Sequence, residues 1–295
     1  MTAPTIRPMT PDDVPAAERL SDESFHELDV RMRRASWPTP RRRGDRHSAW
    51  WVERTQHLLR TDPGGCWVAD DETGMLGFAT SFVRETTWFL ATYVVRPALQ
   101  GRGIGRALLD AALHHGRGCL HGMLSASADP KATRRYHAAG FAMHPQMFLT
   151  GEVDRSAIPA LDKVREGTAG DLELMDSVDR RTRGAAHGPD HELLARHWRL
   201  IVSDSTTGSG YAYLGEGHTV NLLAATNRRT AARLLWAALA DASIDRPVRV
   251  PHLTAANQWA IDVGMAARLE LHQEGYLAVR GMKPPAPYIH DGALL

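Results

Sequence analysis

An internal repeat constrains the fold of this chain more than any other feature of its sequence. The segment Ile6–Asp13 is echoed by Val164–Asp171, at an offset of 158 residues. Two further pairs follow in the same order, namely Arg106–Leu113 with Ala232–Leu239 at an offset of 126, and Ala138–Phe141 with Asp262–Met265 at an offset of 124. Three matching segments in one order predict two tandem copies of a single fold.

Length and composition fit two globular domains. The chain has 295 residues, 43% of them hydrophobic and 23% charged, and at roughly 100–200 residues per domain this predicts about two domains. With 35 basic and 34 acidic residues the net charge is +1, so no overall field attracts the chain to nucleic acid or to a membrane surface. No apolar run approaches the ~20 residues of a membrane span, and the polar, proline-containing start does not resemble a signal peptide. We therefore expect a cytoplasmic protein without membrane or nucleic-acid partners.

The repeat also gives the domain boundaries. The first copy is expected at 1–154, a polar linker at 155–162 and the second copy at 163–295. Each copy begins with a short strand, then Thr with Asp three residues later, which is a helix-capping signal. The helices that follow are predicted at Val14–Leu28 and Leu172–Thr182.

Local patterns give the elements of the first copy. Aromatic and β-branched residues predict a hairpin from Met75–Arg84 and Thr87–Val95. Alanine and leucine at helical spacing predict a helix over Gly103–Gly116. Further elements are expected as helices at Ser48–Arg60 and Lys131–Ala139, and as strands at Cys66–Asp70, Gly122–Ser127 and Phe141–Leu149. The fold class is α/β (α+β), with a mixed, mostly antiparallel sheet flanked by helices in each copy.

The glycine-rich loop after Thr87–Val95 is the segment of the sequence most indicative of ligand binding. Three glycines spaced by one residue let the backbone turn tightly and bring successive N–H groups together. The helix that follows adds its positive end, and two arginines add formal charge. This pattern favours a pyrophosphate ligand, although it matches neither the dinucleotide-binding nor the phosphate-loop spacing. The residues concerned are Gln100, Gly101, Arg102, Gly103, Ile104, Gly105 and Arg106.

The segment Val95–Gly105 resembles the acyl-CoA pyrophosphate motif of the GNAT acetyltransferase superfamily. Asp129–Phe141 resembles that superfamily's next motif, in which Ala, Tyr and Gly-Phe recur. The resemblance covers about the first 155 residues, and the second half resembles the second half of tandem GNAT proteins. It implies acetyl-CoA as cosubstrate and no metal.

The resemblance also implies roles for individual residues. The backbone N–H of Val94 would hold the thioester carbonyl and stabilise the oxyanion. Tyr136 would protonate the departing thiolate, since its neutral hydroxyl can donate to so strong a base. Coenzyme contacts are expected from Val94, Val95, the seven residues from Gln100 to Arg106, Asp129, Lys131 and Tyr136.

The general base is open at this point. Strand Thr87–Val95 contains no carboxylate, and the nearest acid is Glu85 at the end of the hairpin. Glu23 and His26 at the end of the first helix are alternatives, and so is a relay of water.

The second copy lacks the residues that carry this chemistry. Aligned by the repeat, Asn227, Arg229 and Ala231 replace the three glycines, and Ala260 replaces Tyr136. We therefore expect a degenerate copy that packs against the first and helps to shape the acceptor site. Its loop Arg183–His191 either lines an acceptor pocket or is a structured turn. Trp198, Tyr211 and Tyr213 are candidates for a surface between the copies or for the core of their own domain.

Two other clusters have simpler interpretations. His114, His115, Cys119 and His121 do not form a metal site, because adjacent histidines on a helix point about 100° apart. The arginine-rich stretch 31–46 favours a surface loop or a lid for an acidic acceptor over nucleic-acid binding.

The sequence therefore predicts an acetyl-CoA-dependent N-acetyltransferase, with direct transfer to a small-molecule amine in a ternary complex. Acetylation of protein lysines or N-termini is the alternative reaction. A non-catalytic acyl-CoA-binding regulator is an alternative of another class. The chain is expected to be a monomer, as a pseudo-dimer of its domains, or a homodimer.

Overall fold

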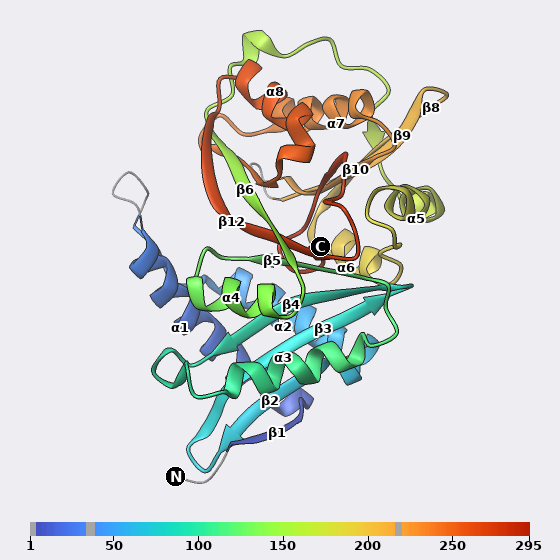
Figure 1. Cartoon of the computed structure of the whole chain (residues 1–295). Helices are drawn as coiled ribbons and strands as arrows, with labels where there is room; N and C mark the ends of the chain where they lie inside the picture. The colour runs from blue at the N-terminus through green and yellow to red at the C-terminus, as the bar shows by residue number, and fades with distance from the viewer. Residues whose placement is uncertain (1–3, 34–38, 216–219) are drawn as a thin grey trace. The chain divides into compact units, whose positions relative to one another are not determined.

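The computed structural model describes residues 4–33, 39–215 and 220–295 and divides into two compact units (Figure 1). Unit 1 comprises Met1–Val83 and Trp88–Cys119, and unit 2 comprises Arg84–Thr87 and Leu120–Leu295. The predicted linker 155–162 lies inside unit 2 and includes a short 3-10 helix, η4 (Arg155–Ala157). The compact units therefore do not follow the predicted boundaries of the two copies. Within the described residues, no helix is both long and apolar enough to cross a membrane.

Unit 1 is a sheet with helices. Its strands lie in the order β1 (Thr5–Pro8), β2 (Cys66–Asp71), β3 (Gly74–Arg84) and β4 (Thr87–Val95), as the run of arrows in Figure 1 shows. The helices are α1 (Val14–Met32), α2 (Asp45–Thr61) and α3 (Ile104–His115). The predicted hairpin and central helix are confirmed to within a residue or two. Four large aromatic side chains are fully buried here, namely Phe78, Phe82, Trp88 and Phe89.

The predicted capping signals are confirmed in both copies. Before α1, η1 (Pro11–Asp13) forms a capping box in which the carboxylate of Asp13 accepts from the backbone of Thr10 at 2.8 Å. Before α5 (Leu172–Thr182), η5 (Ala169–Asp171) repeats this box, with Asp171 accepting from Thr168 at 2.8 Å. Hydrogen bonds from Arg7 and Arg165 hold the pKa of Asp13 and of Asp171 at about 2. The first pair of matching segments, Ile6–Asp13 and Val164–Asp171, therefore forms the same local structure.

In unit 2, a strand from the second half of the chain is inserted between two strands from the first half, which local sequence patterns do not predict. One set of strands lies in the order β5 (His121–Ala126), β12 (Glu270–Arg280), β6 (Ala142–Gly151) and β11 (Val248–Leu253). All three neighbouring pairs are antiparallel. Strand β12 therefore lies between β5 and β6, which precede the predicted linker. Residues from both sides of that linker share one hydrogen-bonded sheet.

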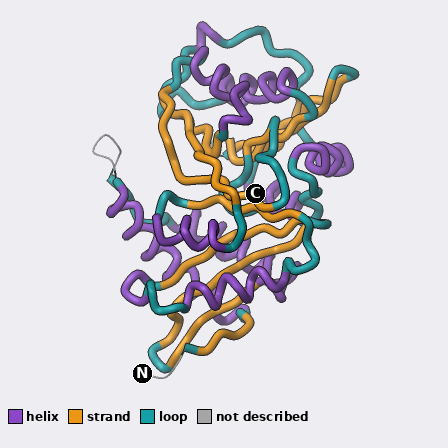
Figure 2. The backbone as a smooth tube through the Cα atoms, in the orientation of Figure 1, coloured by secondary structure: helices purple, strands orange, loops and turns teal. Residues whose placement is uncertain are grey.

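A second sheet of unit 2 comes entirely from residues after the linker. Its order is β13 (Tyr288–Ile289), β10 (Val220–Ala225), β9 (Gly208–Leu214), β8 (Arg199–Ser205) and β7 (Arg165–Glu166). The helices of unit 2 are α4 (Pro130–Ala138), α5, α6 (Asp190–His197), α7 (Arg228–Asp241) and α8 (Gln258–Ala266), drawn in purple in Figure 2. An apolar core joins α7, α8, β10 and β11 through buried residues that include Leu223, Leu234, Leu235, Val250 and Trp259.

The segment that follows β12 forms a short strand, β13, that pairs with the edge of β10. In β13, Ile289 pairs with Leu223 and Tyr288 with Ala224, and the strand also contacts β11. The segment is buried, with Tyr288 2% exposed and Ile289 fully covered. Strand β13 therefore covers one edge of β10 and also contacts β11.

Candidate functional site

The end of β4 leads directly into the glycine-rich loop. Val94 and Val95 are buried at the end of the strand, so their side chains anchor it in the core of unit 1. The next residue, Arg96, donates its backbone N–H to the carbonyl of Leu76 at 2.8 Å. The side-chain amide of Gln100 then donates to the carbonyl of Val95 at 3.2 Å. After the short 3-10 helix η3 (Pro97–Leu99), the loop is therefore tied back to the strand from which it comes.

Glycine is required at the three positions of the loop for different structural reasons. Gly101 and Gly103 have φ of 87° and 90°, the left-handed region that glycine adopts without strain. A Cβ built on either would meet nothing within 4 Å, so open space lies beside both. A Cβ on Gly105 would lie 2.3 Å from the hydroxyl oxygen of Tyr93. Gly101 and Gly103 thus shape an open loop, whereas Gly105 allows close packing.

Helix α3 begins without a side-chain cap in the described part of the chain. Gly103 is its N-cap, and the first N–H bonded back to that residue's carbonyl belongs to Ala107, at 3.1 Å. The N–H groups of the first turn therefore have no partner within the helix and remain available to a ligand. Arg102 and Arg106 are exposed beside them. First-turn N–H groups, the helix dipole and nearby cations are the features by which helix starts bind anions in proteins.

The second motif places its residues on and before α4. Asp129 is the N-cap of this helix, and its Oδ1 accepts from the backbone N–H of Lys131 at 2.9 Å. Tyr136 is buried, 5% exposed, and its carbonyl accepts from the N–H of Phe141 at 3.1 Å. The side chain of Lys131 is exposed. Asp129 therefore has a structural role as a cap, besides the coenzyme contact that the sequence suggested.

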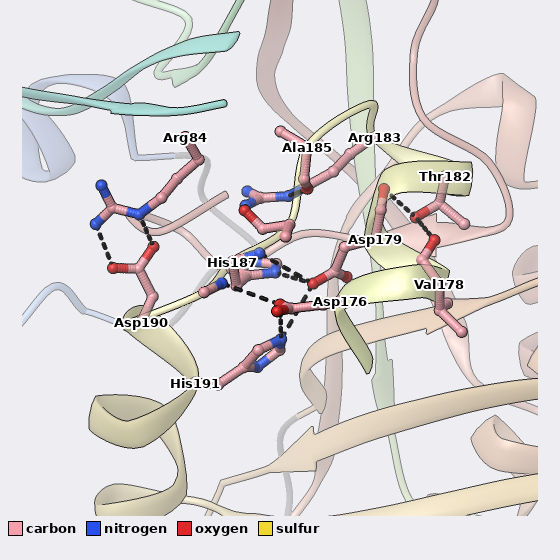
Figure 3. A network of polar contacts seen from close by, with 12 residues as sticks. Arg84, Asp176, Val178, Asp179, Thr182, Arg183, Ala185, His187, Asp190 and His191 are labelled. Atoms are coloured by element: carbon pink, nitrogen blue, oxygen red, sulfur yellow. Dashed lines mark hydrogen bonds and ion pairs between the residues drawn. The ribbon is translucent and has the colours of Figure 1, made fainter. Parts of the chain in front are cut away.

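Glu85, at the turn of the hairpin, belongs to unit 2 and accepts two hydrogen bonds within that unit. Its Oε1 accepts from Nε of Arg180 at 2.7 Å, and its Oε2 accepts from the N–H of Ala186 at 3.4 Å. Next to it, Arg84 forms a buried two-bond ion pair with Asp190, at 2.9 and 2.5 Å (Figure 3). These contacts fix the tip of the hairpin. The carboxylate of Glu85 is occupied by a cation, so service as a general base would require this ion pair to open.

The two alternative bases on α1 differ in their surroundings. Glu23 is 61% exposed and lies 3.8 Å from the guanidinium of Arg42. The Nδ1 atom of His26 is buried and has no hydrogen-bond partner among the residues described. The two candidates therefore differ in that Glu23 lies beside a cation, whereas Nδ1 of His26 has no hydrogen bond within the described residues.

The arginine-rich stretch is partly neutralised by α1. Arg42 contacts Asp22 at 2.6 Å, and Arg43 contacts Glu18 at 2.9 Å. Arg34 and Trp37 belong to the same stretch but lie outside the described residues. Arg42 and Arg43 therefore connect the stretch to α1 by ion pairs. Because these two charges are already paired, they do not favour nucleic-acid binding.

Two of the proposed interface aromatics belong to the core of their own unit. Tyr211 and Tyr213 are fully buried on β9. Their hydroxyl groups contact Asp179 at 2.5 Å and His191 at 3.2 Å. The loop Arg183–His191 also packs inward, since Arg183 and His187 are fully buried. Of its two interpretations, the structured turn fits this burial.

Sequence comparison places the loop and both motif regions in a known domain. Residues 23–141 match the profile of the Acetyltransferase (GNAT) family. The chain contains a GNAT acetyltransferase domain. A curated relative, the mycothiol acetyltransferase of Streptomyces avermitilis, is 36% identical over 88 residues. That match covers 28% of this chain and 29% of the relative, so it spans less than a third of either protein.

Solved structures extend the GNAT likeness over the whole chain. A Pyrococcus horikoshii protein, described provisionally as an acetyltransferase, has a TM-score of 0.71 at 18% identity and covers 99% of this chain and 92% of its own. A GCN5-related N-acetyltransferase from Kribbella flavida has a TM-score of 0.61 at 16% identity, with coverages of 94% and 72%. A tandem GNAT protein from the clavulanic acid biosynthesis pathway has a TM-score of 0.57 at 14% identity, with coverages of 95% and 99%. The predicted mixed α/β fold of tandem GNAT type is thereby confirmed.

Proposed function

We propose that this protein transfers the acetyl group of acetyl-CoA to the amine of a small molecule within a ternary complex. The observation that carries this proposal is the start of α3, an uncapped helix N-terminus with Gly103 as N-cap and Arg102 and Arg106 beside it. Such a terminus binds the pyrophosphate of a coenzyme without competition from a side chain of the helix itself. The match of residues 23–141 to the GNAT family supports acetyl-CoA as the donor.

The chemistry follows from few groups. The N–H of Val94 would hold the thioester carbonyl and stabilise the negative charge that develops on its oxygen. The amine nitrogen forms a bond to the carbonyl carbon, and the bond from that carbon to sulfur then breaks. The phenol of Tyr136 gives its proton to the departing thiolate and is later reprotonated from solvent. The proton that the amine loses passes to His26 or to water.

The acceptor is proposed as a small molecule on two grounds. The curated relative is named for mycothiol, a small thiol, rather than for a protein. In addition, Arg42 and Arg43 are already paired with acidic residues of α1, so their charge is not free to hold an acidic peptide.

The second copy is proposed not to bind acyl-CoA. Two observations support this. The side chain of Asn227 already caps α7, accepting from the N–H of Thr230 at 2.9 Å. Strand β13 pairs with one edge of β10 and also contacts β11. In the first copy the corresponding helix, α3, has no such cap among the described residues.

The experiment is a thioester assay with a panel of acceptors. The full chain is mixed with acetyl-CoA and with small amines, lysine peptides or N-terminal peptides, and thioester loss and free thiol are both followed. Turnover with small amines supports the proposal, and turnover with peptides alone favours a protein acetyltransferase. Tight coenzyme binding without turnover on any acceptor indicates a regulator.

A further inference from the structure

A cluster of two carboxylates and two imidazoles, three of the four buried, lies in unit 2. Asp176 and Asp179 stand three residues apart on α5, whereas His187 lies in the loop before α6 and His191 in the first turn of that helix (Figure 3). Asp179 and His187 are fully buried, and His191 is 2% exposed. Four such side chains converge on one point without any part in the proposed mechanism.

The donor atoms have the spacing of a metal site. One ligand atom from each of Asp179, His187 and His191 lies within 4.8 Å of the other two. Oδ2 of Asp179 is 2.7 Å from Nδ1 of His187 and 3.1 Å from Nε2 of His191. Oδ1 of Asp176 is 3.5 Å from that same Nε2. Ligands about 2.0–2.2 Å from a tetrahedral zinc ion lie about 3.3–3.6 Å from one another, so only a small expansion is needed.

Groups around the cluster orient the donors from outside. The hydroxyl of Tyr211 donates to Oδ1 of Asp179 at 2.5 Å, leaving Oδ2 on the inner side. The hydroxyl of Tyr213 lies 3.2 Å from Nδ1 of His191, which leaves Nε2 for a ligand. The N–H of Gly188 donates to Oδ1 of Asp176 at 3.1 Å. Fixing the second nitrogen of a histidine and the second oxygen of a carboxylate is what outer-shell partners do in metal sites.

The two nitrogens of His187 have different surroundings. Nδ1 lies 2.7 Å from Oδ2 of Asp179 and faces the other donors, whereas Nε2 is buried and has no partner among the described residues. An ion held between the three side chains would therefore take Nδ1.

We infer that Asp179, His187 and His191, with Asp176 as the fourth ligand, form a structural site for a divalent transition metal, most suitably Zn²⁺. Two carboxylates offset the charge of the ion, and imidazole is a preferred ligand of zinc. Binding would displace the proton that His191 donates to the carboxylates. The ion would brace α5 against the loop that carries Asp190, the partner of Arg84 at the tip of the β3–β4 hairpin.

The test is metal binding by the chelator-treated full chain. We expect one equivalent of Zn²⁺ per chain, and a visible Co²⁺ spectrum typical of tetrahedral nitrogen and oxygen ligands. His191→Asn and Asp179→Asn should abolish both. Tyr213→Phe, which removes only an outer-shell partner, should weaken Zn²⁺ binding by about 10–100-fold. His197→Asn, on the same helix but outside the cluster, should bind as the unchanged chain does.

Two results would overturn the inference. One is a full chain that takes up no Zn²⁺ even when the ion is in excess, since the cluster would then be a hydrogen-bonded network only. The other is metal binding that persists unchanged in His191→Asn. If the His191 and Asp179 variants do not fold, the Co²⁺ spectrum of the unchanged chain and its loss of affinity in Tyr213→Phe decide the question.

Discussion

The central helices of the two copies begin in opposite ways. Helix α3 starts at Gly103, in the left-handed conformation and without a side-chain cap in the described chain. Helix α7 starts at Asn227, whose side chain accepts from the N–H of Thr230 at 2.9 Å. The first arrangement leaves the N–H groups of the helix end for an anion, and the second satisfies part of them internally. The two helix starts therefore differ in whether a side chain occupies one of their first N–H groups.

The same contrast holds for the strand before each helix. In the second copy, β10 has β13 as a neighbour, supplied by the segment that follows β12. A strand paired at its open edge cannot accept a ligand along that edge. The copies nevertheless share their first turn, because Arg7 with Asp13 and Arg165 with Asp171 build the same capping box. Divergence is thus concentrated at the positions that would contact coenzyme.

Removal of the second copy should have the largest effect. A fragment of residues 1–154 loses β12, which pairs with both β5 and β6, and β11, which pairs with β6. We expect this fragment to aggregate or to lack a cooperative thermal transition. The matched control is the full chain cut by a protease within 155–162, which keeps both halves and should still melt cooperatively. A soluble fragment with the kcat/KM of the full chain would contradict the prediction.

Tyr136→Phe should have the next largest effect. The ring remains to fill its buried position, but the proton donor to the thiolate is lost, and general acid catalysis is typically worth about 10²–10⁴-fold. We expect kcat to fall by such a factor while coenzyme affinity changes little. Tyr288→Phe, which removes a buried hydroxyl from β13, is the control and should retain turnover. Full kcat in Tyr136→Phe, with chemistry rate-limiting, would assign Tyr136 to packing alone.

Asn227→Ala should have the smallest effect and sharpens the comparison of the helix starts. Loss of an N-cap side chain costs about 1 kcal/mol, and replacement by glycine costs only a few tenths. Urea unfolding should therefore rank the unchanged chain, Asn227→Gly and Asn227→Ala in order of decreasing stability. Coenzyme stoichiometry should not change, because β13 still occupies the edge of β10. A second coenzyme site in either variant would show that the cap alone blocks the second copy.

Local elements of this fold could be predicted because their signals are local. Helix Leu172–Thr182 and strand Thr87–Val95 were expected at the bounds that the structure shows. The capping boxes depend only on residues three apart. By contrast, the insertion of β12 between β5 and β6 joins residues more than 100 positions apart, and no periodicity specifies such a partner.

The candidate site shows the same limit. The glycine pattern predicted the loop, because positive φ at Gly101 and Gly103 is a local requirement. The capping role of Asp129 could have been found from the proline that follows it, a common start of a helix. The ion pair of Glu85 with Arg180 and the buried cluster around Asp179 could not, since both depend on contacts across the tertiary fold.

Calorimetric titration of the full chain with coenzyme A tests the central claim most directly, namely that only the first copy binds. We expect one site per chain. Gly103→Glu should lower affinity by at least about 100-fold, because a left-handed non-glycine residue is strained and its carboxylate repels the pyrophosphate. Gly118→Glu, at an exposed glycine with open space around it, should bind normally. Two equivalent sites, or undiminished binding by Gly103→Glu, would contradict the account.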